Sequence, residues 1–192
     1  MKAQRSIRLG RYLNLEEFCT CTQTYRRWSD SIEPFPKNLE ETIPAVQALC
    51  NYIIDPVIDQ YGQTQFKLTY GFCSSDLKRF LAQKDPLTGL KNGKSTPSVD
   101  QHMACEKNRH GRYYCDRLGA ACDFRIVDLD SNALVEWILG QALPFDSLYY
   151  YGPNRPIHIS YGPQHKRQIW AFTEQGTPTK QGAQHWQRQV KG

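Results

Sequence analysis

Apolar residues recur at steps of three and four along residues 38–61, the spacing of a helix with one buried face. The positions are Ile43, Val46, Leu49, Cys50, Ile53, Ile54, Val57 and Ile58. Pro56 is expected to kink or divide this helix because proline has no backbone N–H. Near the N-terminus, Asn14 with Glu17 three residues later predicts the capped start of a short helix.

Shorter patterns elsewhere predict strands and further helices. Alternation of apolar and polar positions predicts strands at 63–70, 121–127, 147–151, 157–161 and 168–172. Helices are expected at 76–81 and at 131–141, the second capped by Ser131. Gly, Asn and Pro in the turns between the last three strands favour antiparallel neighbours. We therefore expect an α+β fold, with an antiparallel sheet of about four or five strands packed against two main helices.

Length and composition indicate one globular domain. The chain has 192 residues, of which 40% are hydrophobic and 22% charged, enough to bury one core. We expect a single domain over residues 1–172 and a flexible tail over 173–192, where Gln, Gly, Thr and Lys dominate. No stretch approaches the ~18 apolar residues of a membrane helix, and Met1 precedes a polar, basic segment. These features predict a cytoplasmic protein with no membrane partner.

Cysteine count and charge restrict the chemistry further. Seven cysteines cannot all pair within one chain, so free thiols or metal ligands are expected. A net charge of +5 permits an anionic partner without requiring one. Cations alternate with aromatics at 26–28, 107–114 and 166–170, a mixture that suits nucleic acid, sugar polymers or an ordinary surface. Nucleic acid is therefore a partner that we do not favour.

Three residues have the chemistry of a metal site. Asp123 lies among small and apolar residues, and His158 lies between isoleucines, where an unpartnered polar group is costly to bury. His102 follows an exposed loop at 84–97. Two imidazoles and one carboxylate would leave a fourth tetrahedral position open, as in catalytic zinc sites. From spacing alone the metal site is the weaker interpretation, because a histidine inside an apolar strand is more often a hydrogen-bonded core residue.

The order of five segments resembles the zinc D-Ala-D-Ala carboxypeptidase family. The segments YGFCSSDL, SVDQHM, GAACDF, FDSL and IHIS occupy residues 70–77, 98–103, 119–124, 145–148 and 157–160. Members of that family carry a Ser-Gly-Tyr-Arg-Ser segment, a Ser-x-His-x-x-Gly-x-Ala-x-Asp segment and a late His after a strand. The resemblance covers roughly residues 12–172. It implies the hedgehog/DD-peptidase fold, with one zinc ion held by His102, Asp123 and His158.

The chain departs from the family pattern at the groups that assist the metal. The family places a Glu or Asp base shortly before the last His, whereas Tyr151 and Arg155 are the polar residues found near that position here. Cys73 replaces the Arg that would stabilise the developing charge, and with Ser74 it is expected to line the substrate pocket. Each missing group can contribute about 3 kcal/mol of transition-state stabilisation. Either other residues replace them or turnover is lost.

The stretch between the first His and the Asp is longer than in the family, as if residues 104–117 were inserted at the mouth of the site. Cys105, His110 and Cys115 could bind a second zinc ion. Alternatively, His110 or Glu106 folds over the first metal as the missing base. A Cys105–Cys115 disulfide in an oxidising setting and a solvated basic loop with ordinary thiols are the other two interpretations.

The leading hypothesis is a zinc-dependent hydrolase that cleaves a peptide or amide bond, in a peptide or cell-wall-type substrate, with a metal-activated water. Tyr151, Arg155, Glu106 and His110 are the candidates for polar assistance. The alternative is a zinc-stabilised binding or regulatory module, including one that binds nucleic acid, that has lost peptidase turnover.

Overall fold

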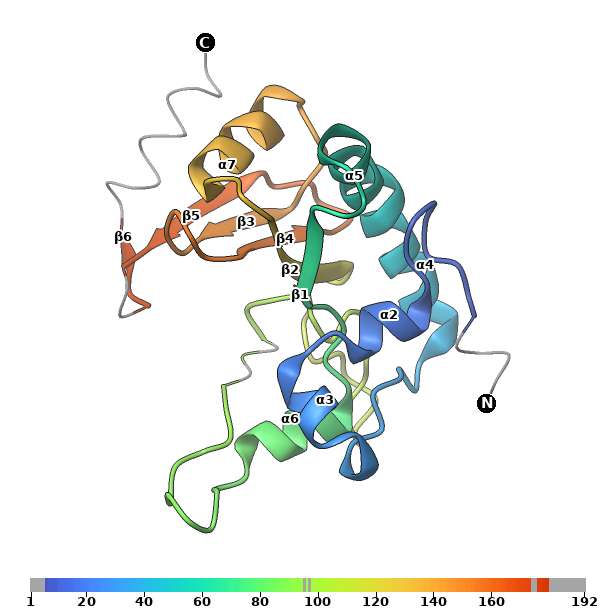
Figure 1. Ribbon diagram of the computed structural model, residues 1–192. Helices are drawn as coiled ribbons and strands as arrows, with labels where there is room; N and C mark the ends of the chain where they lie inside the picture. Colours follow the sequence, from blue (N-terminus) through green and yellow to red (C-terminus); the bar gives the residue numbers. More distant parts are fainter. Residues whose placement is uncertain (1–5, 95, 97, 174–175, 180–192) are drawn as a thin grey trace.

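A computed structural model describes residues 6–94, 96, 98–173 and 176–179. Its centre is a six-stranded sheet with the strand order β1-β2-β4-β3-β5-β6 (Figure 1). The strands are β1 Phe66–Tyr70, β2 Ala120–Ile126, β3 Ser147–Tyr150, β4 Ile157–Tyr161, β5 Gln168–Phe172 and β6 Pro178–Thr179. The α-helices are α2 Leu15–Thr20, α3 Gln23–Arg27, α4 Leu39–Leu49, α5 Asp55–Tyr61, α6 Ser75–Ala82 and α7 Ser131–Gly140. The predicted α+β class is confirmed.

The sheet is mixed, and the expectation of a purely antiparallel sheet is wrong. β3 and β4 pair antiparallel, but β5 pairs parallel with β3. After β4 the chain does reverse direction, as its turn residues predicted. It then crosses to the far side of β3 instead of remaining beside β4. A strand that runs opposite to β4 is necessarily parallel to β3, so the turn fixed the direction and the packing fixed the neighbour.

The long amphipathic segment is divided, as the proline predicted, but the division begins before that residue. A π-helical turn, Cys50–Ile54, separates α4 from α5, and Pro56 lies in the first turn of α5. A π-turn leaves the regular i to i−4 bonding pattern, so the missing N–H of proline falls where the helix is already irregular. Near the N-terminus the predicted capping box is confirmed, since Asn14 and Glu17 exchange side-chain to backbone hydrogen bonds at 2.9 Å.

The cap of α7 differs from the sequence-based expectation by one residue. Asp130 accepts the hydrogen bond of the Asn132 backbone N–H and is the N-cap. Ser131 instead donates its hydroxyl to the carbonyl of Arg155 at 2.6 Å. That bond ties the start of α7 to the turn that precedes β4.

One face of the sheet is apolar and lies against helices. α4 contacts β2 and β4, and α7 contacts β2; Figure 1 shows these helices with α5 on the same side of the strands. On β2 the side chains of Cys122, Phe124 and Ile126 belong to this core, whereas Asp123 is less buried and Arg125 is exposed. Because successive strand residues point to opposite faces, the opposite face of the sheet is free to carry polar groups.

The pairing register aligns one residue from each of five strands across that second face. Tyr70 of β1 pairs with Asp123 of β2, and Asp123 pairs with His158 of β4. His158 pairs with Tyr149 of β3, and Tyr149 pairs with Trp170 of β5. Directly opposite residues of an antiparallel pair have Cβ atoms about 4.5–5.5 Å apart, so the row places Tyr70, Asp123, His158 and Tyr149 side by side.

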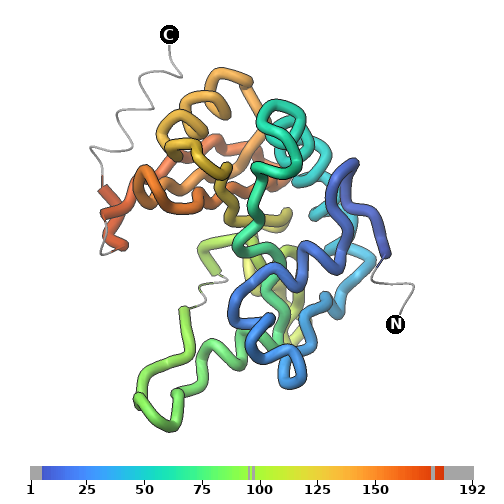
Figure 2. The backbone as a smooth tube through the Cα atoms, viewed as in Figure 1, coloured from blue at the N-terminus to red at the C-terminus, as the bar shows by residue number. Residues whose placement is uncertain are grey.

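The remaining segments surround this sheet. Residues 84–94 of the loop predicted at 84–97 extend away from the sheet in Figure 2, and Leu87 there is 95% exposed. In the predicted tail, Pro178–Thr179 form β6 against β5, and residues 180–192 lie outside the described part. Among the described helices, none has the length and apolar character needed to cross a membrane.

We predict that Gly71→Ala destabilises the fold strongly, because a Cβ at Gly71 would lie 2.1 Å from the Phe18 carbonyl oxygen. Relief requires a backbone shift, and such overpacking costs about 1–3 kcal/mol or more. Urea denaturation measures the free energy of unfolding. The matched control is Gly140→Ala, where a Cβ meets nothing within 4 Å; alanine there should be neutral or stabilising. Equal stabilities for the two variants would contradict the close approach at Gly71.

Candidate metal centre

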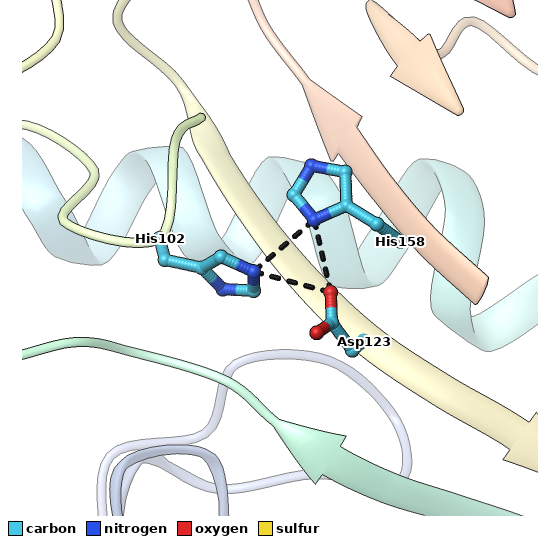
Figure 3. A group of neighbouring side chains, drawn as sticks. All are labelled: His102, Asp123 and His158. Carbon is cyan, nitrogen blue, oxygen red and sulfur yellow. Dashed lines mark hydrogen bonds and ion pairs between the residues drawn. The ribbon is translucent and has the colours of Figure 1, made fainter. Parts of the chain in front are cut away.

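His102, Asp123 and His158 come together from three separate parts of the chain. His102 lies in the segment between α6 and β2, Asp123 on β2 and His158 on β4, and their side chains point to a common centre in Figure 3. His102 Nε2 lies 3.1 Å from Asp123 Oδ1 and 3.1 Å from His158 Nδ1. His158 Nδ1 lies 2.9 Å from Asp123 Oδ1. Each residue thus offers one atom to the same small volume.

The hydrogen bonds of His102 set the form in which it could bind a metal. Its Nδ1 lies 2.8 Å from the Gly71 carbonyl oxygen, which can only accept, so Nδ1 carries the proton. In the neutral ring, Nε2 then turns a lone pair toward the centre. Ligand atoms at tetrahedral bonds of about 2.0 Å are about 3.3 Å apart, so the three atoms need to separate only slightly to hold zinc.

The outer nitrogen of His158 is the incomplete part of this fit. A ring that binds a metal through Nδ1 carries its proton on Nε2 and usually donates it to a neighbour. Nε2 of His158 is buried and has no hydrogen-bond partner among the described residues. The three inner atoms therefore fit a divalent ion, whereas the outer hydrogen bond of this ligand is not supplied by the described protein atoms.

Neighbouring groups hold the two histidines in place. The ring of Tyr149 stacks on His158 at 4.5 Å with an interplanar angle of 15°. Tyr70 meets His102 edge-on at 4.6 Å. The backbone of His102 is fixed as well, because its N–H donates to Asp100 Oδ1 at 3.2 Å and its carbonyl accepts from the N–H of Cys73 at 2.9 Å. The site is therefore preorganised on the sheet.

Without a metal, the centre is an ion pair. Burial by itself would lower the pKa of His102, but the charge and hydrogen bond of Asp123 outweigh it and raise this pKa from 6.5 to about 9. Burial likewise favours the neutral form of Asp123, but the charge and hydrogen bonds of the two histidines hold its pKa below the ordinary 3.8. A metal ion would take the place of the proton that otherwise balances the carboxylate.

The centre lies in a pocket of about 340 Å³. Besides the three candidate ligands, the pocket is lined by Tyr70, Lys94, Thr96, Val99, Asp100, Tyr149, Tyr151 and Phe172. Tyr149 and Tyr151 contact Phe172 with ring centroids 5.5 Å and 5.1 Å away, which makes one wall aromatic. A substrate in this pocket would meet both the centre and a set of polar groups.

The polar lining includes residues that the sequence analysis did not single out. Asp100 lines the pocket beside His102. It accepts hydrogen bonds from the backbone N–H of His102 and from Thr96 Oγ1, the second at 3.3 Å. Lys94 adds a cation. The only sign in the sequence that Asp100 could lie near the centre was its position two residues before His102. No local sequence pattern predicts how this loop returns to the sheet.

Of the other predicted site residues, some line the pocket and others do not. Tyr151 lines the pocket as expected, whereas Arg155 is exposed in the turn before β4 and does not line it. Cys73 and Ser74 are buried and do not line the pocket either. Ser74 caps α6 by accepting from the N–H of Leu77 at 3.0 Å. Ser74 therefore holds the start of the helix, Cys73 donates its backbone N–H to the His102 carbonyl, and neither lines the pocket.

Glu106 anchors the inserted segment instead of reaching the centre. Its Oε1 accepts the backbone N–H groups of Lys37 and Asn38, each at 2.8 Å, and its Oε2 accepts from Ser75. A carboxylate at the start of α4 also complements the partial positive charge of the helix N-terminus. The proposed role of Glu106 as a base that folds over the metal does not agree with these contacts.

The Cys and His residues of the insertion do not form a second centre. His110 is exposed in the turn between Lys107 and Tyr113, whereas Cys105 and Cys115 are buried. Within the described ranges, His102, Asp123 and His158 form the only group of three such side chains close enough to share an ion. Cys105 and Cys115 are both free thiols. The structure therefore shows neither the second zinc site nor the disulfide.

We predict that the purified protein binds one zinc ion and that His102→Ala abolishes this binding, because two remaining ligands cannot hold zinc tightly. Cys105→Ala and His110→Ala should retain one ion each. Elemental analysis of the three variants beside wild type, prepared without chelator, measures this. A second ion that disappears only with Cys105→Ala would show that the insertion binds metal after all.

We also predict a pH signature for the metal-free protein. The raised pKa of His102 means that its pairing with Asp123 stabilises the fold fully below about pH 6.5 and is lost as the pH rises through about 9. The lowered pKa of Asp123 adds stability above its ordinary pKa that is lost on acidification. Urea unfolding of chelator-treated protein from pH 5 to 8, below the range in which the buried cysteines ionise on unfolding, should show a decline with rising pH that His102→Gln lacks. His110→Gln, a change at an exposed histidine, should leave the decline in place.

Comparison with protein-family models, with curated proteins and with solved structures found no match to this chain. The resemblance to the zinc D-Ala-D-Ala carboxypeptidases rests on the sequence segments quoted above.

Proposed function

We propose that this chain is a zinc-dependent hydrolase similar to the D-Ala-D-Ala carboxypeptidases, and that it cleaves a peptide or amide bond in a cell-wall-type peptide. The observation that carries the proposal is the convergence of His102 Nε2, Asp123 Oδ1 and His158 Nδ1 within a pocket that also contains a fourth polar group, Asp100. A hedgehog/DD-peptidase fold is part of the same proposal, supported by the order of the motifs along an α+β chain.

Zinc held by the three residues would supply Lewis-acid activation of water and of the scissile carbonyl. Two imidazoles and one carboxylate are the donor set of catalytic sites, which keep a coordination position open for reactants. The pocket of about 340 Å³, lined by the three residues, would leave room for a peptide segment beside them.

Asp100 offers a carboxylate in place of the Glu or Asp base that the family carries and that this chain lacks before His158. Its Oδ1 accepts from the His102 N–H and its Oδ2 from Thr96 Oγ1, so the group is oriented within the pocket. A carboxylate in this place can take the proton of the attacking water and return it to the leaving amine. We assign this role to Asp100 in preference to Glu106 and His110, whose contacts direct them elsewhere.

Tyr151 fits the role of hydrogen-bond donor to the substrate. It lines the pocket, and burial raises the pKa of its hydroxyl well above the ordinary value of 10.0, so the group remains protonated at neutral pH. A protonated phenol can stabilise the charge that develops on a carbonyl oxygen. Tyr151 would thus replace part of the stabilisation lost with Cys73 in place of arginine.

We predict that Asp100→Asn lowers kcat/KM by about 10²–10⁴-fold while the zinc content stays at the wild-type level, because the amide cannot accept the proton. Hydrolysis of synthetic cell-wall peptides, including ones ending in D-Ala-D-Ala, is followed by amine release. Asp116→Asn in the exposed part of the insertion is the matched control and should retain activity.

A protein that binds zinc but hydrolyses no cell-wall peptide would contradict the proposal. Salt-sensitive binding of nucleic acid in such a protein would instead favour the binding or regulatory module. The burial of Cys73 where the family has arginine is the observation that favours this second function.

A further inference from the structure

We infer that Arg117 is a positioning residue for the metal centre: by fixing the Val99 carbonyl to the buried Asp146, it holds the loop that brings His102 to Asp123 and His158. The inference rests on the proposed metal site but not on the proposed reaction. It also assigns a function to the end of the inserted segment.

Every nitrogen of the Arg117 guanidinium is bonded. Nε and Nη2 donate to Asp146 Oδ2 at 3.2 Å and 2.8 Å, and Nη2 also donates to Ser147 Oγ at 3.0 Å. The remaining nitrogen, Nη1, donates to the Val99 carbonyl oxygen at 2.9 Å. The planar fork of arginine can satisfy these acceptors together, which the single ammonium of lysine cannot do.

Asp146 is the anchor of this arrangement. It is 1% exposed and accepts from Gln101 Nε2 at 3.0 Å and from the Lys166 backbone N–H at 3.1 Å, besides Arg117. Gln101 is the neighbour of His102, and its Nε2 also donates to the Leu118 carbonyl at 2.8 Å. The loop is therefore held at two adjacent places, at Val99 by Arg117 and at Gln101 by Asp146.

The same carbonyl connects the loop to the other histidine. Tyr149 donates its hydroxyl to the Val99 carbonyl oxygen at 3.3 Å while its ring stacks on His158 at 4.5 Å. Ser147, which accepts from Arg117, lies 2.7 Å from Ser160 Oγ, and Ser160 is two residues beyond His158 on β4. One hydrogen-bond network thus sets the positions of both imidazoles relative to each other.

Space around this network is tight. A Cβ at Gly162 would lie 2.6 Å from Gln101 Nε2 and 3.1 Å from Asp146 Oδ2. Hydrogen-bonded groups behind metal ligands typically change metal affinity by about 10- to 100-fold when they are removed. Arg117 acts on the ligands through the Val99 carbonyl and Asp146, whereas Tyr149 bonds to the same carbonyl and also stacks directly on His158.

The test compares Arg117→Lys, Tyr149→Phe and wild type. Lysine retains a cation for the buried Asp146 so that the protein can fold, but it cannot reach all three acceptors. Phenylalanine keeps the ring on His158 and removes only the hydroxyl bond to Val99. The zinc dissociation constant is measured by chelator competition, the geometry of the centre by the absorption spectrum of the cobalt-substituted protein, and the fold by urea unfolding of the metal-free form.

We expect Arg117→Lys to weaken zinc binding by about 10- to 100-fold and to alter the cobalt spectrum. Tyr149→Phe should weaken binding by a smaller factor. The matched control is Arg125→Gln, which removes an exposed cation from the strand that carries Asp123 and should leave affinity and spectrum unchanged. A purely structural role would lower the unfolding free energy of Arg117→Lys without changing its affinity in the folded state.

Wild-type affinity and an unchanged cobalt spectrum in Arg117→Lys would overturn the inference and leave the proposed function standing. Weaker zinc binding by Arg117→Lys, together with a wild-type protein that binds zinc but hydrolyses no cell-wall peptide, would support the inference and contradict the proposed function. A wild-type protein that binds no zinc would overturn both.

Discussion

The antiparallel pairing of β2 with β4 sets Asp123 directly opposite His158, and the candidate metal centre depends on this register. A slip of one residue would exchange the faces of the strand, because side chains alternate with a period of two. Asp123 would then enter the apolar core, and Phe124 would occupy the polar face. The free energy of burying an unpaired carboxylate and exposing an aromatic ring opposes that slip.

The helices enforce this register from the other side of the sheet. α4 packs against β2 and β4, where Phe124, Ile157 and Ile159 are fully buried. None of these residues contributes to the centre. Their role is to orient the two strands so that the residues between them, Asp123 and His158, face the pocket. The apolar face therefore determines the chemistry of the polar face without touching it.

The third ligand is held by a different kind of interaction. His102 belongs to no strand or helix. Hydrogen bonds with Gly71, Cys73 and Asp100 fix its position. The inserted segment is joined to this arrangement at both ends, through Glu106 at the start of α4 and through Arg117 at Asp146. A segment for which a second metal site was one of several interpretations instead fastens loops near the candidate centre.

The sequence by itself determined most of the secondary-structure elements and the chemistry of the candidate ligands. The period of the apolar residues located α4, α5 and α7 and the strands β2 to β5, because burial of one face imposes a period on a helix or a strand. The placement of Asp123 and His158 among apolar residues, and of His102 after an exposed loop, singled out the three converging side chains, and the resemblance to a family supported the choice.

Only the tertiary structure decided which of the other polar residues belong to the centre. Asp100 lines the pocket and Arg155 does not, although Arg155 lies only two residues before β4, the strand that carries His158. Likewise, β5 joined β3 in parallel because the space beside β4 was already occupied by β2 and β3. Both outcomes depend on contacts between residues distant in the chain, whereas a sequence pattern reports on the burial of each position and not on its neighbours in space.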